Sequence, residues 1–279
     1  MSAPVGVTGS TGRLGGRVAR LLAGSGAEQR LLVRDPARAP SLDGAAPARM
    51  SYDDRAAVEE ACAGLDLVFM VSAAESATRL EEHRAFVDAA AAAGVRHLVY
   101  LSLCGAAPDA TFTLARDHFH TEEHIRASGM AWTFLRDNLY LDFLPMMQGD
   151  DGVIRGPAGD GRVGAVAQDD VAAAAHAVLR EAARHEGATY TLTGPEAFTL
   201  TEAAEVLTRV TGRRVLFEDE TLEEAYASRA SYGAPGWQVD AWVSTYTAIA
   251  AGEMAEVTDD VERLAGRPPL SLEELFGRG

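Results

Sequence analysis

The chain has 279 residues, of which 47% are hydrophobic, and a formal net charge of −16. This length and apolar content exclude a disordered chain and allow one large α/β domain, with or without a smaller lobe. The acidic balance, with no basic stretch to offset it, excludes nucleic acid and anionic membrane as expected partners. No run approaches the roughly 20 apolar residues of a membrane span and no export signal is evident, so we expect a cytoplasmic protein.

Lysine is absent, and all 25 basic residues other than histidine are arginine. This excludes Schiff-base chemistry and any Tyr-x-x-x-Lys pair. The two cysteines, Cys62 and Cys104, are too few for a disulfide scaffold or a zinc site. We therefore expect no metal, and a reducing environment fits the cysteine content.

A glycine-rich turn, TGSTGRLGG, runs from Thr8 to Gly16. It lies between an apolar run, residues 3–7, and a segment with helical apolar spacing, residues 14–22. The order strand, glycine turn, helix predicts dinucleotide binding. In such a turn the first glycine allows a tight bend, the second a close approach of the pyrophosphate, and the third close helix packing.

The expected contacts to the cofactor pyrophosphate come from this turn and from the free N–H groups at the start of the helix. Arg13 adds a charge-assisted contact to phosphate. The expected binding residues are Gly9, Ser10, Thr11, Gly12, Arg13, Leu14 and Gly15.

The second predicted strand, Leu31 to Val33, ends at Arg34. An acid at this position binds the ribose 2′-hydroxyl of NAD, whereas an arginine grips the 2′-phosphate of NADP. Asp35 follows directly and would be the ribose acid if the strand ended one residue later. We favour NADP(H) as the cofactor on this spacing.

Strand-like and helix-like segments then alternate. The predicted helices are Tyr52–Ala63, Thr78–Ala93 and Thr113–Ser128, and the predicted strands are Leu65–Val71, Val95–Leu101 and Trp132–Leu135. Repeated βα units with continuous apolar strands indicate an α/β fold, a Rossmann-like doubly wound parallel sheet with helices on both faces.

The pattern changes after about residue 137. A glycine-rich irregular stretch precedes a helix that Asp169 or Asp170 caps and that runs to Ala183, and a strand follows at Thr189–Leu192. The rest is mainly helical, with one strand at Arg214–Phe217. We predict a Rossmann domain of residues 1–139, joined again by about 165–194. Residues 140–164 and 195–279 form a small, mainly helical C-terminal lobe on the substrate side.

Small residues follow two neighbouring predicted strands. Val71, Ser72 and Ala73 lie at the carboxyl end of one strand, and Ser102 lies at the end of the next. Because ligands bind at the carboxyl ends of parallel strands, these residues are expected to line the nicotinamide side of the crevice. Plain loop serines are the alternative.

Five segments together resemble a known family. They are TGSTGRLGG, LLVRDPAR (31–38), HFHTEEHIRASG (118–129), WTFLRDNLY (132–140) and DVERLAGRPPLSLEELF (260–276). The chain resembles the NmrA-like branch of the atypical short-chain dehydrogenase/reductase superfamily, and within it the NAD(P)H:quinone oxidoreductases of the type-2 bacterial kind. The resemblance implies a Rossmann fold, NADP(H) and a small C-terminal lobe. Catalysis does not follow from it alone, because the founding regulator of the branch binds the cofactor without turnover.

Three candidate catalytic residues follow from this resemblance. Other members of the superfamily carry Tyr-x-x-x-Lys on the helix after Thr113; here the lysine position aligns with His118. His118 is expected to bind the nicotinamide ribose or to act as a weak proton donor near neutral pH. A serine near Ser102 helps to bind a carbonyl in other members, and Tyr140 is expected to face the substrate or to pack at the lobe interface.

Two further sequence patterns bear on the candidate site. The branch often has Arg-Asn-x-x-Tyr where this chain has Arg136, Asp137, Asn138, Leu139 and Tyr140. An amide donor is therefore missing unless Asn138 replaces it. His120 and His124 form a second helical pair, but no third ligand is evident, so we interpret them as solvated side chains.

The leading hypothesis is an NADPH-dependent oxidoreductase acting on a planar apolar acceptor, such as a quinone or an aromatic polyketide-like metabolite. Hydride transfer to such an acceptor requires positioning more than a strong acid. The alternative is a non-catalytic NADP(H)-binding redox sensor with a protein partner. A homodimer is the commonest assembly for such a chain.

Overall fold

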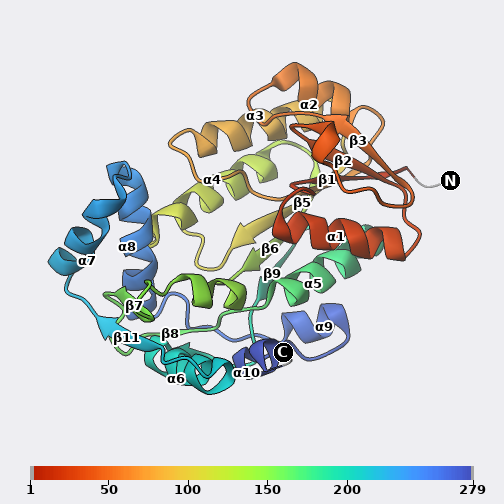
Figure 1. Ribbon diagram of the computed structural model, residues 1–279. Helices are drawn as coiled ribbons and strands as arrows, with labels where there is room; N and C mark the ends of the chain where they lie inside the picture. The colour runs from red at the N-terminus through yellow and green to blue at the C-terminus, as the bar shows by residue number, and fades with distance from the viewer. Residues whose placement is uncertain (1–2, 278–279) are drawn as a thin grey trace. The chain divides into compact units, whose positions relative to one another are not determined.

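The computed structural model describes residues 3–277 and shows, within that range, a seven-stranded sheet in the order β3-β2-β1-β4-β5-β6-β9 (Figure 1). The strands are β1 (Val5–Thr8), β2 (Gln29–Val33), β3 (Ala45–Arg49), β4 (Leu67–Met70), β5 (His97–Leu103), β6 (Ala131–Asp137) and β9 (Ala188–Leu192). β1 pairs in parallel with β2 and β4, and the β2–β3 and β4–β5 pairs are also parallel. The strand order reverses between β1 and β4, so their carboxyl ends form the switch point at which such sheets bind ligands.

Helices cover both faces of this sheet. They are α1 (Arg13–Gly24), α2 (Arg55–Cys62), α3 (Arg79–Ala92), α4 (Thr113–Ala127) and α5 (Gln168–Arg180). Figure 1 shows α2 and α3 on one face and α1 and α5 on the other. The predicted Rossmann-like doubly wound α/β fold is therefore confirmed.

An enclosed apolar core holds β4, β5 and β6 against the helices α2 to α4. Phe86 of α3 and Ile125 of α4 pack with Tyr100 and Phe134 of the sheet, and all four side chains are fully buried. Burial of each large side chain contributes about 1.5–3 kcal/mol. This layer fixes the strands whose carboxyl ends carry the candidate site.

The chain divides into two compact units. The first comprises Met1–Ser102, Asp117–Arg136 and Val171–Tyr190, and the second comprises Leu103–Arg116, Asp137–Asp170 and Thr191–Gly279. Residues 103–116, which the sequence assigned to the Rossmann domain, cluster with the second unit. One cause is Glu253, whose carboxylate accepts hydrogen bonds from the Thr111 backbone N–H (3.0 Å) and hydroxyl.

The second unit combines helices with two short sheets. Its elements are η2 (Leu141–Met146), β7 (Val153–Gly156), β8 (Arg162–Val163), β10 (Phe198–Thr199), α6 (Leu200–Thr211), β11 (Leu216–Asp219), α7 (Leu222–Arg229), α8 (Gly236–Ala250), α9 (Asp260–Ala265) and α10 (Leu272–Phe276). β8 pairs antiparallel with β10, and β7 pairs in parallel with β11. Ile154, Leu207 and Ile249 belong to its own buried core.

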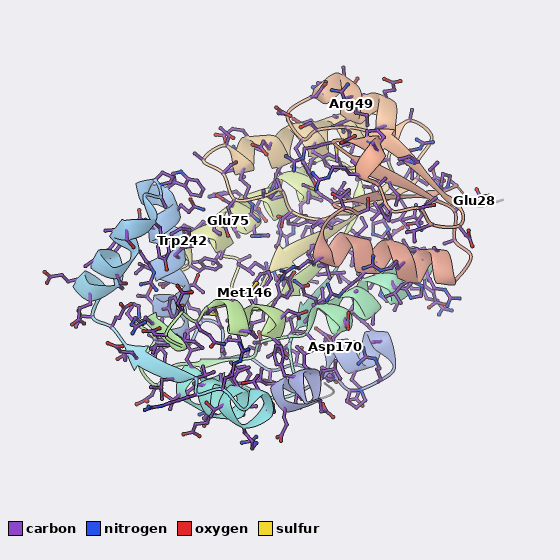
Figure 2. The ribbon with its side chains drawn as sticks, viewed as in Figure 1. Glu28, Arg49, Glu75, Met146, Asp170 and Trp242 are labelled. Atoms are coloured by element: carbon purple, nitrogen blue, oxygen red, sulfur yellow. The ribbon has the colours of Figure 1, made fainter. Side chains whose placement is uncertain are left out.

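Strand β3 and helix α5 are among the elements that differ from the sequence prediction. β3, Ala-Ala-Pro-Ala-Arg, was missed because it lacks the β-branched and aromatic residues of typical strands; as an edge strand it tolerates Pro47. α5 begins at Gln168, so Asp170 lies in its first turn and is not its cap. The Asp170 carboxylate, labelled in Figure 2, accepts the Leu270 N–H at 2.7 Å and pairs with Arg267 at 2.7 Å. Among residues 3–277, no helix is long and apolar enough to cross a membrane.

Candidate active site

The glycine turn joins β1 to α1 at the switch point. Gly9 has a φ of 63°, a left-handed conformation that favours glycine. The Gly12 N–H donates to the Gly9 carbonyl at 2.8 Å and closes the turn. A Cβ on Gly15 would lie only 2.4 Å from the same carbonyl oxygen, so glycine alone allows α1 to pack this close to β1. The predicted strand, turn and helix are confirmed.

The start of α1 fits a phosphate group. Gly12 is its N-cap, with no side-chain capping bond and no acidic residue in the first turn. A Cβ on Gly12 would lie 3.2 Å from the Gly9 oxygen. Ser10 is buried, and its hydroxyl has no hydrogen-bond partner. Backbone N–H groups at a helix start and an unpartnered hydroxyl suit an anion, so these residues would hold the pyrophosphate, with Thr11 and Arg13 exposed beside them.

Thr8 connects the two strands of the switch point. Its hydroxyl oxygen accepts the Val71 N–H at 2.8 Å and the Tyr52 hydroxyl at 2.9 Å. The Tyr52 hydroxyl also contacts the Val71 carbonyl, and burial raises the pKa of Tyr52. Val71, expected from the sequence to line the crevice, is therefore fixed to the end of β1. Tyr52 was not singled out from the sequence.

The structure separates the two candidates at the end of β2. The strand ends at Val33, so Arg34 is the first residue beyond it and is exposed. The Asp35 carboxylate accepts the Ala37 N–H at 3.1 Å and caps the short helix η1 (Pro36–Arg38). One carboxylate oxygen of Asp35 is thus engaged by the Ala37 N–H, whereas Arg34 is exposed directly after β2.

Two residues of α3 hold Ala73, which follows β4 at the switch point. Arg79 Nε donates to the Ala73 carbonyl at 3.1 Å, and His83 Nε2 accepts the Ala73 N–H at 2.9 Å. His83 Nδ1 therefore carries the ring hydrogen and donates to Thr121 Oγ1 at 2.9 Å. Burial lowers the pKa of His83 to about 3. Both residues were missed, although their i, i+4 spacing at the start of the helix after β4 was a usable signal.

His118 lies between a cation and a phenol. Arg79 Nη2 is 2.9 Å from His118 Nε2, and Tyr100 Oη is 2.8 Å from His118 Nδ1. Because arginine only donates, Nε2 accepts and Nδ1 donates to Tyr100. Burial, assisted by the Arg79 charge, holds the pKa of His118 well below its usual value. The lowered pKa leaves the ring neutral near pH 7, which disfavours His118 as a proton donor at that pH.

The hydroxyl group of Ser102 donates its hydrogen bond to Glu122. The Ser102 hydroxyl donates to Glu122 Oε1 at 2.6 Å, and both side chains are fully buried. Arg136 also holds the carboxylate, with Nε 2.8 Å from Oε1 and Nη2 2.7 Å from Oε2. A serine that donates its hydroxyl proton to a buried carboxylate has no second O–H for a substrate carbonyl. Glu122 lies one turn beyond His118 on α4.

Tyr140 and its neighbours belong to the second unit. The Tyr140 hydroxyl donates to the Asp137 carboxylate, and burial, followed by the Asp137 charge, raises the pKa of Tyr140 well above its usual value. Asn138 Nδ2 donates to the Met254 carbonyl at 3.0 Å, so this amide stabilises the backbone of the unit. Met146, labelled in Figure 2, is 55% exposed on η2, whereas Leu144 is buried.

His124, one member of the His120 and His124 pair, has a protein partner. His124 Nε2 lies 2.7 Å from Asp88 Oδ1. Across residues 3–277, no group of three or more His, Cys, Asp or Glu side chains could hold a metal ion. Cys62 and Cys104 are both buried free thiols.

Comparison with known proteins shows full-length similarity. A family model described as NAD(P)H-binding matches residues 9–182. Quinone oxidoreductase 2 of Escherichia coli is 32% identical over 277 residues, covering 97% of this chain and 96% of that protein. A (4-alkanoyl-5-oxo-2,5-dihydrofuran-3-yl)methyl phosphate reductase of Streptomyces griseus is 38% identical over 269 residues, covering 94% and 93%. A solved NADPH-dependent quinone oxidoreductase from Escherichia coli, complexed with NADPH, has a TM-score of 0.89 at 32% identity, covering 98% of this chain and 99% of that one.

Substitution of Gly15 tests the packing of the turn. In Gly15→Ala the new Cβ meets backbone atoms that cannot rotate away, so we expect α1 to shift, a loss of about 1–3 kcal/mol in unfolding free energy, and weaker NADPH binding. The matched control is Gly24→Ala at the end of the same helix, where a Cβ has nothing within 4 Å. Denaturant titration and NADPH calorimetry measure both effects. Equal behaviour of the two variants would contradict this account.

Proposed function

Since the chain belongs to the NAD(P)H-binding family, we propose that it is an NADPH-dependent oxidoreductase that passes hydride to a planar, electron-poor acceptor. A quinone or an aromatic polyketide-like metabolite is the acceptor class. The observation that carries this proposal is that each candidate acid of the chain is already engaged. Ser102 donates to Glu122, Tyr140 donates to Asp137, and His118 is neutral beside Arg79.

The lack of a free general acid in the site restricts which acceptors the protein would reduce. A general acid contributes typically 10²–10⁴-fold to a proton transfer, so a simple ketone would be reduced slowly without one. A quinone delocalises the charge it receives with the hydride, and its product takes a proton from water. This chemistry depends on positioning of the two rings more than on proton donation.

The cofactor site supports NADPH as the hydride donor. Bound NADPH supplies the hydride from its nicotinamide ring. Ser10, Gly12 and the start of α1 would hold the pyrophosphate, and Arg34 would grip the 2′-phosphate. Val71 to Ala73 and His118 would lie along the nicotinamide half.

The relatives support the acceptor class. One is named a quinone oxidoreductase. The other is named for a 5-oxo-2,5-dihydrofuran that carries an alkanoyl group, which is also a conjugated acceptor. Both names describe substrates that accept hydride into an electron-poor conjugated system, which agrees with a site that lacks a free acid.

A non-catalytic redox sensor is the second candidate. The absence of a Tyr-Lys pair and the engaged protons of Ser102 and Tyr140 favour it. Such a protein would bind NADP(H) without turnover and signal through a protein partner.

Turnover separates the two candidates. We expect the protein to oxidise NADPH with a panel of benzoquinones and naphthoquinones, and to act at least 100-fold more slowly on simple aldehydes and ketones. Absorbance at the NADPH band measures both rates. NADPH binding with no turnover on any acceptor would reject the enzyme and favour the sensor.

Arg34 decides the choice between NADPH and NADH. Loss of a charge-assisted contact of about 1.5–3 kcal/mol predicts that Arg34→Ala weakens NADPH binding by roughly 10- to 100-fold, with NADH binding unchanged. The matched control is Asp35→Ala, which removes a cap of η1 and should not weaken NADPH binding. Calorimetric titration with both cofactors provides the affinities. If Asp35→Ala weakened NADH binding instead, Asp35 would be the ribose acid.

A further inference from the structure

Arg79 is a buried cation with no anionic partner. Arg79 is 5% exposed. Its Nε donates to the Ala73 carbonyl, and its Nη2 donates to His118. The third nitrogen, Nη1, is buried without a hydrogen-bond partner, and Arg79 makes no ion pair within residues 3–277. An unpaired buried charge is costly, so its retention calls for a function.

The surroundings of Arg79 do not cancel its charge. Four titratable side chains face Arg79, and all four are neutral near pH 7. They are Tyr52 in the segment before α2, His83 of α3, Tyr100 of β5 and His118 of α4. The Asp117 carboxylate of α4 also interacts with this charge, but it is half-buried and forms no ion pair with Arg79. The site therefore retains a fixed positive charge.

The position of this charge is set by its two contacts. Ala73 follows β4 at the switch point, and His118 stands at the position that the family resemblance aligns with a lysine. Both belong to the nicotinamide half of the proposed cofactor site. One guanidinium thus joins the two protein segments that are expected to border the nicotinamide.

We propose that Arg79 makes this site selective for the reduced cofactor, because its charge disfavours the cationic nicotinamide ring of NADP⁺ and spares the uncharged ring of NADPH. The inference rests on the proposed function only for the placement of the cofactor. In the reaction, the C4–H bond of NADPH breaks and both of its electrons leave with the hydride. The acceptor becomes an anion that takes a proton from water, and the ring becomes a cation. A fixed positive charge then promotes release of NADP⁺.

Binding without any acceptor tests the inference. The affinities for NADPH and NADP⁺ are measured by calorimetry for the wild type, Arg79→Met, Arg79→Lys and the control Arg84→Met. Arg84 is an exposed arginine of the same helix. We expect the wild type to prefer NADPH and Arg79→Met to reduce the preference by roughly fivefold or more. Arg79→Lys should keep most of the preference, and Arg84→Met should keep all of it.

Two outcomes would overturn the inference. One is an unchanged preference in Arg79→Met, and the other is an equal loss in Arg79→Lys, which would assign the effect to geometry and not to charge. The ratio of the two affinities is insensitive to a general weakening of the site, and circular dichroism checks folding. If Arg79→Met does not fold, Arg79→Gln replaces it with the same criterion. Quinone turnover with an unchanged ratio rejects only this inference, whereas an altered ratio without turnover rejects only the proposed function.

Discussion

Direct contact between the backbone of α1 and the end of β1 is the constraint on which the candidate site depends. At Gly15 a methyl group would lie 2.4 Å from the Gly9 carbonyl oxygen, so any larger residue moves the helix start away from the switch point. Thr8, in the same turn, bonds to Val71 and so fixes the end of β4 as well. Backbone geometry therefore sets the shape of the turn at which we propose that the cofactor phosphate binds.

A layer of engaged polar groups lies beneath the other half of the site. The chain has no lysine, and the positive charge in this layer that forms no ion pair within residues 3–277 belongs to Arg79, which bonds to a neutral His118. Ser102 donates to a carboxylate that Arg136 also holds. These contacts give rigidity and a fixed charge but no free acid. That combination fits hydride transfer to an acceptor which stabilises its own negative charge, and it explains how such a site can work without the Tyr-Lys pair.

The features that the sequence predicted correctly are those that depend on residues close together in the chain. Glycine spacing predicted the turn, and apolar runs predicted most strands. Arg34 lies directly after β2, as the sequence predicted. β3 was missed because alanine and proline carry no strand signal. The contacts of Arg79 with His118 and of His83 with Thr121 could not be predicted, because they join residues 39 and 38 positions apart in the chain. Such contacts exist only after α3 and α4 pack on the same face of the sheet.

The central claim is that the chain transfers hydride from NADPH and does not merely bind it. Single-turnover mixing of the NADPH complex with a quinone, using NADPH deuterated at either C4 position, tests this most directly. The account predicts stoichiometric oxidation of NADPH and a primary isotope effect for one of the two deuterated forms. Bound NADPH that stays reduced in the presence of quinone would contradict it. When the chemical step limits the rate, oxidation of NADPH with no isotope effect from either deuterated position would also contradict it.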